Sequence, residues 1–245
     1  MTENIFSIRP FQNINFSIPP ITTWILDPPY NVGFKYDNIK DNLPLQEYNN
    51  FIESSSQFMF DHSTPNSSLF LIHYKIPAAR LIPIIESSGW VLHQWISWVY
   101  PHNMGMSKKR FTQGSRAVLW FTKGTPNTHI KAVPGIYKNP NDSRIKQRIA
   151  EGHSPALMDW WHINLRKNVS KGHRKYANQL PYELLKRIIL TTSSPHDYIG
   201  DIMAGSGTTL EVSQHHNRNV FLNDINPKVL PLWTQLSTSS FEVVN

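Results

Sequence analysis

The stretch TTWILDPPYNVGFKY, residues 22–36, places an acid, two prolines and a tyrosine directly after a hydrophobic run. The run TTWIL (22–26) has the β-branched and aromatic residues of a buried strand. Proline has no backbone N–H to donate and cannot continue a central strand, so the chain must turn there. We therefore expect Asp27 and Tyr30 to lie beside each other at the end of a strand.

Helix and strand patterns alternate along the rest of the chain, which predicts an α/β sheet. Apolar residues recur at roughly helical spacing in four segments: 45–60, 77–89, 181–190 and 208–216. Strand-like runs occupy five further segments: 68–74, 90–100, 116–123, 197–202 and 219–224. The last two of these strands enclose the helix at 208–216 and form a strand–loop–helix–strand unit.

The composition excludes several classes of protein. The chain has 245 residues, 40% of them hydrophobic, which suffices for one large domain with a buried core. It has no cysteine, so disulfides, thiolate metal sites and cysteine catalysis are excluded. There is no run of eighteen apolar residues, and MTENIFSIRP lacks the layout of a signal peptide. We expect a soluble cytoplasmic protein without membrane contact.

The positive charge gathers in the middle of the chain. The formal net charge is +7, and residues 123–178 hold eleven Lys or Arg against three acids. Such an excess favours a polyanionic partner, although a solvated basic surface has the same composition. Periodicity fades in this part, which is typical of an inserted segment rather than of sheet scaffold. Its one aromatic cluster, DWWHINL (159–165), is expected to pack rather than to stack on bases.

The stretch DIMAGSGTT, residues 201–209, is expected to be a ligand-binding loop between a strand and a helix. Gly205 and Gly207 let the backbone approach a ligand, and the N–H groups of the helix start follow. Asp224 ends the next strand, where it can accept hydrogen bonds from ribose hydroxyls. The dinucleotide and phosphate-loop fingerprints are both absent. The loop suits an adenosine-containing cofactor, and a plain tight turn is the alternative.

The DPPY segment has the groups needed to hold a planar ring with an exocyclic NH2. The Asp27 carboxylate and the Pro28 carbonyl accept hydrogen bonds, and Tyr30 offers an aromatic face. These properties describe adenine N6 or cytosine N4. A Pro-Pro turn with a capping Asp is the alternative, which the pairing with a glycine loop and a downstream acid disfavours.

The order of these motifs resembles the β class of DNA amino-methyltransferases that use S-adenosylmethionine, in which DPPY precedes the glycine-rich loop. The similarity spans TTWILDPPYNVGF, the pair WISWVYPHNM and SRAVLWFTKG, and the segment from ANQLPYELL to NDINP. It implies a three-layer α-β-α, Rossmann-like fold with circularly permuted motif order, whose mostly parallel sheet has an antiparallel edge hairpin. It divides the chain into a catalytic half (1–123), a target-recognition insertion (124–178) and a cofactor-binding half (179–245).

The resemblance also implies site residues. The catalytic residues would be Asp27, Pro28, Pro29 and Tyr30. The residues binding S-adenosylmethionine would be Asp27, Asp201, Met203, Ala204, Gly205, Ser206, Gly207, Thr208, Thr209, Asp224 and Ile225. No metal is expected, since the adjacent His215 and His216 lack metal-ligand spacing. This class tends to have an acidic strand end upstream of the catalytic strand, whereas residues 8–21 contain no acid, so Asn13 or Asn15 would stand in.

The implied activity is methyl transfer to adenine N6 in duplex DNA, with the target base flipped out of the helix. DPPY favours adenine, while cytosine N4, RNA, or an inactive nucleic-acid-binding relative remain alternatives. A nicotinamide-dependent enzyme would leave DPPY without a role. A homodimer and a cognate restriction endonuclease are further expected partners. The residues expected to contact DNA are Lys108, Lys109, Arg110, Arg144, Lys146, Arg148, Arg166, Lys167, Lys171, Arg174 and Lys175.

Overall fold

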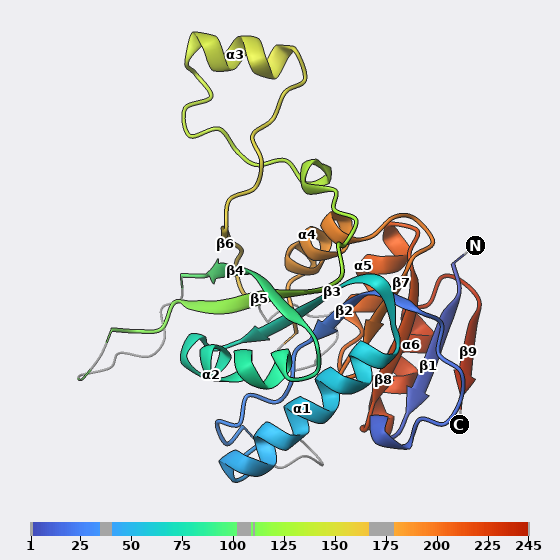
Figure 1. The fold of residues 1–245 in the computed structure, drawn as a ribbon. Helices are drawn as coiled ribbons and strands as arrows, with labels where there is room; N and C mark the ends of the chain where they lie inside the picture. Colours follow the sequence, from blue (N-terminus) through green and yellow to red (C-terminus); the bar gives the residue numbers. More distant parts are fainter. Residues whose placement is uncertain (1, 35–40, 102–108, 110, 167–178, 245) are drawn as a thin grey trace.

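The computed structural model describes residues 2–34, 41–101, 109, 111–166 and 179–244. These residues form one nine-stranded sheet with helices on both faces (Figure 1). The strands are β1 (Asn4–Ile8), β2 (Ile21–Leu26), β3 (Ser63–His73), β4 (Val91–Val99), β5 (Ser115–Lys123), β6 (Trp160–His162), β7 (Tyr198–Asp201), β8 (Asn219–Asp224) and β9 (Phe241–Val244). The helices are α1 (Leu45–Asp61), α2 (Lys75–Glu86), α3 (Ser143–Ala150), α4 (Tyr182–Thr192), α5 (Thr208–His215) and α6 (Leu230–Leu236).

The strand order is β6-β4-β5-β3-β2-β7-β8-β1-β9. Strand β5 runs antiparallel to β3 and β4, and the other pairings are parallel. This arrangement confirms the predicted mostly parallel sheet with an antiparallel hairpin. The structure adds β6 beyond the hairpin. It also adds β1, which lies between β8 and β9 and was not predicted as a strand.

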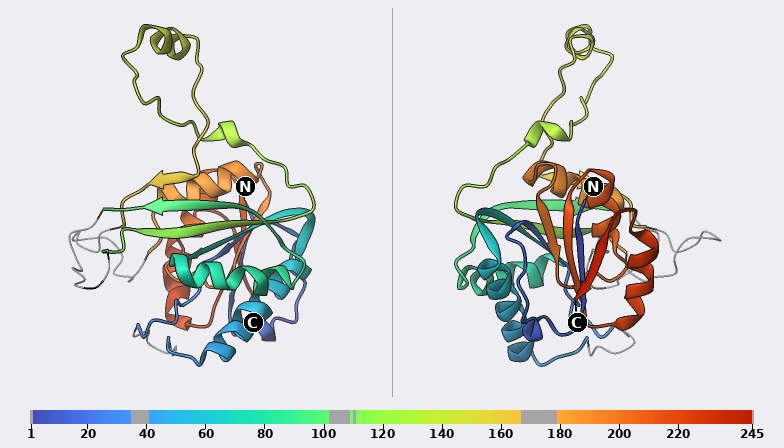
Figure 2. Two further views of the ribbon diagram at one scale, coloured as in Figure 1. Left: turned by 60° about the vertical axis from the view of Figure 1, so that its left-hand side comes forward. Right: turned by 90° about the vertical axis from the view of Figure 1, so that its right-hand side faces the viewer.

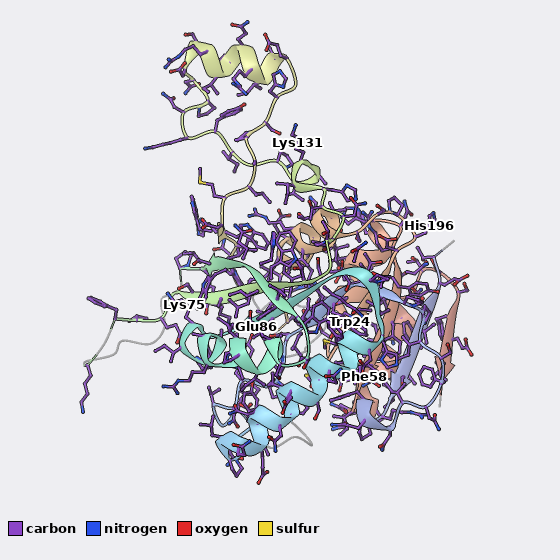
Figure 3. The ribbon with its side chains drawn as sticks, in the orientation of Figure 1. Trp24, Phe58, Lys75, Glu86, Lys131 and His196 are labelled. Carbon is purple, nitrogen blue, oxygen red and sulfur yellow. The ribbon has the colours of Figure 1, made fainter. Side chains whose placement is uncertain are left out.

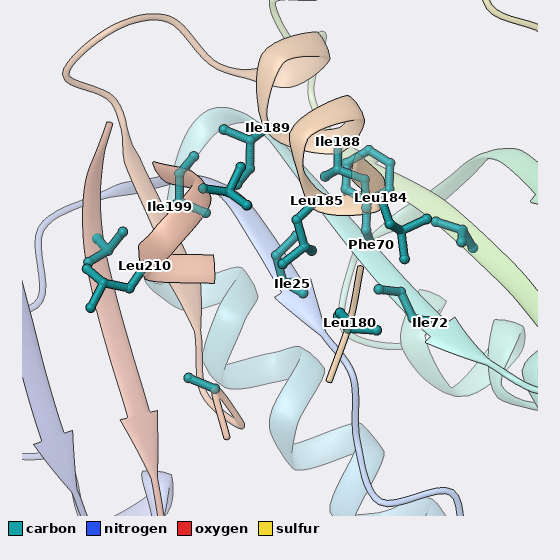
Figure 4. Packing of buried hydrophobic residues seen from close by; sticks show 14 of the residues in the cluster. Ile25, Phe70, Ile72, Leu180, Leu184, Leu185, Ile188, Ile189, Ile199 and Leu210 are labelled. Atoms are coloured by element: carbon teal, nitrogen blue, oxygen red, sulfur yellow. The ribbon is translucent and has the colours of Figure 1, made fainter. Parts of the chain in front are cut away.

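The two faces of the sheet are covered because successive side chains of a strand point to opposite sides. Ile25 of β2 packs with Leu184, Leu185 and Ile188 of α4 on one face (Figure 4). Its neighbour Trp24 packs on the other face with residues of α1 and α2. Figure 3 shows Trp24 close to Phe58 of α1, and their rings meet edge to face at 6.3 Å. The expected three layers are therefore present.

The segment between β5 and β6 extends from the body as an arm, with α3 at its far end (Figures 1 and 2). Asp142 caps α3 by accepting a hydrogen bond from the Arg144 N–H at 2.9 Å. The arm returns to the sheet at β6, where Trp161 is buried and Trp98 Nε1 donates to the Ile163 carbonyl. Sequence analysis describes this part as an inserted segment rather than sheet scaffold, and the structure differs at β6, because Trp161 completes the core beside β4.

The topology brings the two sequence motifs together. Strands β2 and β7 pair in parallel, with Ile25 opposite Asp201, although 176 positions separate them in the sequence. Because parallel strands end at the same edge of a sheet, the DPPY turn and the glycine-rich loop both lie at the carboxyl edge. Among the described residues, no helix has the length and hydrophobicity that a membrane span requires.

The centre of the sheet leaves no room for a side chain at Gly200. A Cβ at this position would lie 2.3 Å from two ring atoms of the buried Trp24. We predict that Gly200→Ala lowers the free energy of unfolding by roughly 1–3 kcal/mol, as overpacking of a core does. Urea unfolding measures the change. Gly114→Ala is the control, since its nearest contact would be an ordinary 3.6 Å, and equal losses in both variants would contradict the prediction.

Candidate active site

Three carboxylates gather at the carboxyl edge of the sheet. Asp27 follows β2, Asp201 ends β7 and Asp224 ends β8, and these strands are neighbours. Burial raises the pKa of Asp201 to about 7, and the charges of Asp27 and Asp224 act in the same direction. Burial also raises the pKa of Asp224. Carboxylates so arranged favour a ligand that brings positive charge.

The glycine-rich loop is held by two of these acids. Asp201 accepts hydrogen bonds from the Met203 N–H at 3.1 Å and from the Thr209 hydroxyl at 2.6 Å. Asp224 accepts from the Gly205 N–H at 2.9 Å. Gly205 and Gly207 have φ values of 46° and 77°, in the left-handed region that glycine adopts without strain. The stretch 201–209 thus connects strand β7 to helix α5, as the sequence predicts, and the role of Asp224 toward ribose hydroxyls stays a prediction.

The other predicted loop residues lie in the same turn. The Ala204 N–H donates to the Asn223 carbonyl at 3.1 Å, and the Ser206 and Thr208 hydroxyls are 3.0 Å apart. Trp233 of α6 donates from Nε1 to the Gly205 carbonyl at 3.0 Å, which fixes the loop from behind. Ile225, just after β8, is about half exposed and is free to contact a ligand.

In the DPPY turn, Asp27 and Tyr30 lie side by side. The Tyr30 hydroxyl donates a hydrogen bond to Asp27 Oδ1 at 2.6 Å. Burial raises the pKa of Asp27 to about 6, while the hydrogen bond from Tyr30 and the charge of Arg116 act to lower it. The Asp27 carboxylate is therefore charged at neutral pH and titrates just below it.

A histidine and a tyrosine outside the motif hold the turn. The Tyr74 N–H donates to His73 Nδ1 at 2.7 Å, so the proton of the neutral ring is on Nε2. Nε2 can then donate to the Tyr48 hydroxyl at 3.0 Å, which itself donates to the Pro29 carbonyl at 2.8 Å. Burial lowers the pKa of His73 to about 4, which keeps this chain intact at neutral pH. A histidine ending the apolar run SLFLIHY was the available sequence signal.

Asp41 anchors the residues that follow DPPY. Its buried carboxylate accepts hydrogen bonds from the backbone N–H groups of Asn31, Val32 and Phe34, at 2.7, 3.2 and 2.8 Å. The Asn31 side chain adds two hydrogen bonds to the backbone of Leu43. Sequence analysis missed Asp41, because no local pattern reveals which backbone groups a carboxylate will meet.

Arg116 of β5 also reaches the turn and was missed. Its Nη1 donates to the Tyr30 hydroxyl at 2.9 Å, and its guanidinium lies over the Tyr30 ring at 4.9 Å. The position is the second residue of β5, opposite Trp98 of β4. The antiparallel direction of β5 brings its start, rather than its end, to the carboxyl edge.

The basic residues predicted to contact DNA are separated in the structure. Arg144, Lys146 and Arg148 are exposed on α3 of the arm, and Lys109 is exposed beside the hairpin. Arg166 instead lies near α5, with Nη1 3.5 Å from a Glu211 carboxylate oxygen. The other predicted contacts lie outside the described residues: Lys108, Arg110, Lys167, Lys171, Arg174 and Lys175.

Two weaker sequence candidates can also be placed. Asn13 and Asn15 follow β1, whose last residue Ile8 pairs with Asp224, and Arg9 Nη1 lies 3.3 and 3.5 Å from their oxygens. They therefore follow a strand that ends beside Asp224. Among the described residues, no group of three or more acids or histidines could hold a metal ion.

The charge of Asp27 should make the protein less stable at neutral pH. Its pKa is raised from 3.8 to about 6 on folding, so its contribution to stability is present below pH 3.8 and is lost as the pH rises through 6. We predict that Asp27→Asn, which keeps an acceptor for Tyr30, is more stable than the natural protein at pH 8. The advantage should shrink as the pH falls through 6. Urea unfolding between pH 5 and 8 without cofactor tests this, and equal stability at pH 8 would contradict it.

The sequence matches one family model and several characterised relatives. The family model described as DNA methylase matches residues 21–235. The type II methyltransferase M1.MboII of Moraxella bovis is 25% identical over 224 residues, covering 82% of this chain and 83% of the relative. The DNA adenine methyltransferase YhdJ of Escherichia coli is 23% identical over 224 residues, covering 84% and 72%.

Solved structures agree with the fold. The PvuII DNA methyltransferase, described as cytosine-N4-specific, has a TM-score of 0.70 and 16% identity, covering 99% of this chain and 95% of that one. A complex of M1.HpyAVI with S-adenosylmethionine has a TM-score of 0.57 and 18% identity, covering 89% of each chain. The matched region contains both the DPPY turn and the glycine-rich loop, and the chain belongs to the DNA methylase family, the S-adenosylmethionine-dependent amino-methyltransferases of DNA.

Proposed function

We propose that this DNA methyltransferase modifies the N6 amino group of adenine in double-stranded DNA. One observation carries the proposal: the Asp27–Tyr30 pair lies at the sheet edge next to Asp201 and Asp224. Asp27 in the first position of the motif favours adenine over cytosine in this family. The adenine-specific relative supports the same choice.

The residues of the cofactor half suit S-adenosylmethionine. That molecule carries a sulfonium, an ammonium and ribose hydroxyls, which are all groups that carboxylates bind. Asp201 and Asp224 would hold it, together with the backbone of the loop from Met203 to Thr209. The stretch 201–209 contains no Lys or Arg that would neutralise phosphates, which fits a cofactor without them. When bound, the cofactor supplies the methyl group.

Asp27 would act on the amino group of the target base. The N6 lone pair is delocalised into the adenine ring, so the nitrogen is a weak nucleophile. Hydrogen bonds from N6 to the Asp27 carboxylate and the Pro28 carbonyl would favour a pyramidal nitrogen with a localised lone pair. The carboxylate would also stabilise the positive charge that develops on nitrogen. Positioning of this kind contributes up to roughly 7–11 kcal/mol.

The base must leave the duplex to reach this turn. Unstacking costs a few kcal/mol, and stacking on an aromatic ring returns about 1–3 kcal/mol. Tyr30 is the aromatic residue of the motif, and its ring already contacts His73 at 4.7 Å and Tyr74 at 5.0 Å. These contacts would hold it in place for the incoming base.

The arm would contact DNA through α3. Arg144, Lys146 and Arg148 are exposed on one short helix that stands away from the sheet (Figure 2). Most contacts of such residues are to phosphates, which position the protein without reading sequence. In the predicted division of the chain, this arm belongs to the recognition insertion, which lies between the catalytic half and the cofactor-binding half.

We predict that Asp27→Asn lowers the rate of methyl transfer by roughly 10²–10³-fold, as loss of one preorganised electrostatic group does. The measurement is transfer of a labelled methyl group from S-adenosylmethionine to unmodified duplex DNA, followed by nucleoside analysis. Asp61→Asn, at the opposite edge of the sheet, is the control and should keep full activity.

Nucleoside analysis also separates the alternatives. N6-methyladenine is the expected product, and N4-methylcytosine would overturn the choice of base while keeping the role of Asp27. Methyl transfer to RNA but not DNA would overturn the substrate. Cofactor binding without transfer to any nucleic acid would support an inactive binding protein. An active Asp27→Asn variant would contradict the mechanism.

We predict that DNA binding weakens steeply with salt and that the arm contributes to the slope. Removing one phosphate-binding side chain should reduce the slope of log K against log salt by about 0.9. Lys146→Gln and Arg148→Gln should each show this reduction in a fluorescence anisotropy titration. Arg80→Gln, exposed on α2, should leave the slope unchanged. The same slope in all three variants would place the DNA-binding surface elsewhere.

The proposed function also implies two protein partners. A homodimer and a cognate restriction endonuclease would accompany an enzyme of a restriction–modification system. The proposal places the protein in the cytoplasm of a bacterium or archaeon, where host or phage DNA is available.

A further inference from the structure

Arg116 occupies an aromatic box at the active edge of the sheet. Its guanidinium lies over the rings of Tyr30, Trp98, Tyr74 and Tyr100, at 4.9, 5.2, 5.5 and 5.7 Å from their centroids. The four rings come from three places: the DPPY turn, the end of β3, and β4 with the residue after it. A guanidinium stacked in this way is fixed in position and keeps its charge.

The box connects Arg116 to the catalytic carboxylate. Arg116 Nη1 donates to the Tyr30 hydroxyl at 2.9 Å, and that hydroxyl donates to Asp27 Oδ1 at 2.6 Å. The Tyr30 proton is therefore directed at Asp27, because the lone pair of the hydroxyl accepts from Arg116. Tyr30 stays neutral, since burial and the Asp27 charge raise its pKa well above the ordinary value.

From these contacts we infer that Arg116 is a positioning residue of the methyl-transfer reaction, which holds Tyr30 against Asp27 and keeps the Asp27 carboxylate ionised. The inference deepens the proposed function, since it rests on Asp27 accepting hydrogen bonds from the target amino group. The ionised carboxylate only accepts hydrogen bonds, whereas the protonated form presents an O–H donor on one of its oxygens.

The charges around Asp27 make this support necessary. Burial raises the Asp27 pKa to about 6, and Arg116 is the cation whose charge lowers it. Asp201 of β7 is coupled to Asp27 as a like charge. His73 of β3 contacts Tyr30, but its pKa of about 4 leaves it neutral. Without the Arg116 charge, burial would raise the pKa of Asp27 further, toward neutral pH.

Arg116 itself is adapted to this role. Burial acts against its charge, but the neighbouring Tyr30 and Asp27 raise its pKa above the ordinary value, so it remains a cation. Its Nε is buried and has no hydrogen-bond partner among the described residues. The Tyr100 hydroxyl is a further hydrogen-bond partner of Arg116, and the four aromatic rings around the guanidinium tolerate its charge.

The test is a direct titration of Asp27 in the full-length protein without cofactor or DNA. Protein labelled with ¹³C at the aspartate carboxyls is followed by NMR from pH 4 to 9. Asp27→Asn assigns the signal by its loss. The variants compared are Arg116→Met, which keeps the apolar stem without the charge, and Arg116→Lys, which keeps the charge. Arg187→Met is the control, because Arg187 is also stacked on an aromatic ring, that of Trp161.

We predict that Arg116→Met raises the Asp27 pKa by at least about one unit, the effect expected from losing a nearby opposite charge. Arg116→Lys should keep most of the effect of the charge, and Arg187→Met should change nothing. In methyl-transfer assays, the acidic limb of the pH–rate profile of Arg116→Met should move upward by the same amount. Its rate loss should therefore be largest at neutral pH and smallest at pH 9.

An unchanged Asp27 titration in folded Arg116→Met would overturn the inference. An equal loss of rate at every pH would do the same, because it would show only a packing role. Near-UV circular dichroism checks the fold. Should Arg116→Met not fold, Arg116→Lys and Tyr30→Phe decide the question. Tyr30→Phe removes the hydroxyl link and should raise the Asp27 pKa. Since the NMR titration needs no catalysis, a different target base would leave this result intact.

Discussion

The parallel pairing of β2 with β7 is the constraint on which the site depends. It joins residues from opposite ends of the chain and sets Ile25 opposite Asp201. The strand ends then place Asp27 and Asp201 at one edge, and β8 adds Asp224 beside them. The apolar layers of α4 and of α1 with α2 hold the strands in this order. A shift of register by one residue would turn every side chain of β2 to the opposite face.

The three carboxylates at the carboxyl edge of the sheet lower the stability of the folded protein, and the proposed function gives a reason for them. Three buried or partly buried carboxylates with raised pKa values are unfavourable in a protein without its ligand. A ligand with a sulfonium and an ammonium would offset this repulsion when it binds. In our proposal, Arg116 would keep Asp27 charged while a neutral base is bound. Under the proposed function, the same edge would combine a site for a cationic cofactor with an acceptor for an amino group.

The boundary between the arm and the sheet differs from the boundary predicted from the sequence. The part of the arm around α3 extends from the body, whereas the His129 N–H donates to the Thr191 carbonyl of α4, and β6 returns to pair with β4 and buries Trp161. This anchoring connects the exposed helix α3 to the hairpin that also carries Arg116. Strands β6, β4, β5, β3 and β2 are consecutive in the sheet, so they connect the arm to the turn that contains Asp27.

The α/β class, most strand and helix positions, and the two loops were predictable from the amino-acid sequence. This was possible because proline turns, glycine loops and apolar periodicity are local properties, visible at DPPY, at Gly205 and in α4. Asp27 and Tyr30 were found in this way. The tertiary structure alone decided that Arg116, His73, Tyr48 and Asp41 support the turn. Each reaches it from a distant strand, helix or loop, and such contacts depend on strand order and register, which no local pattern encodes.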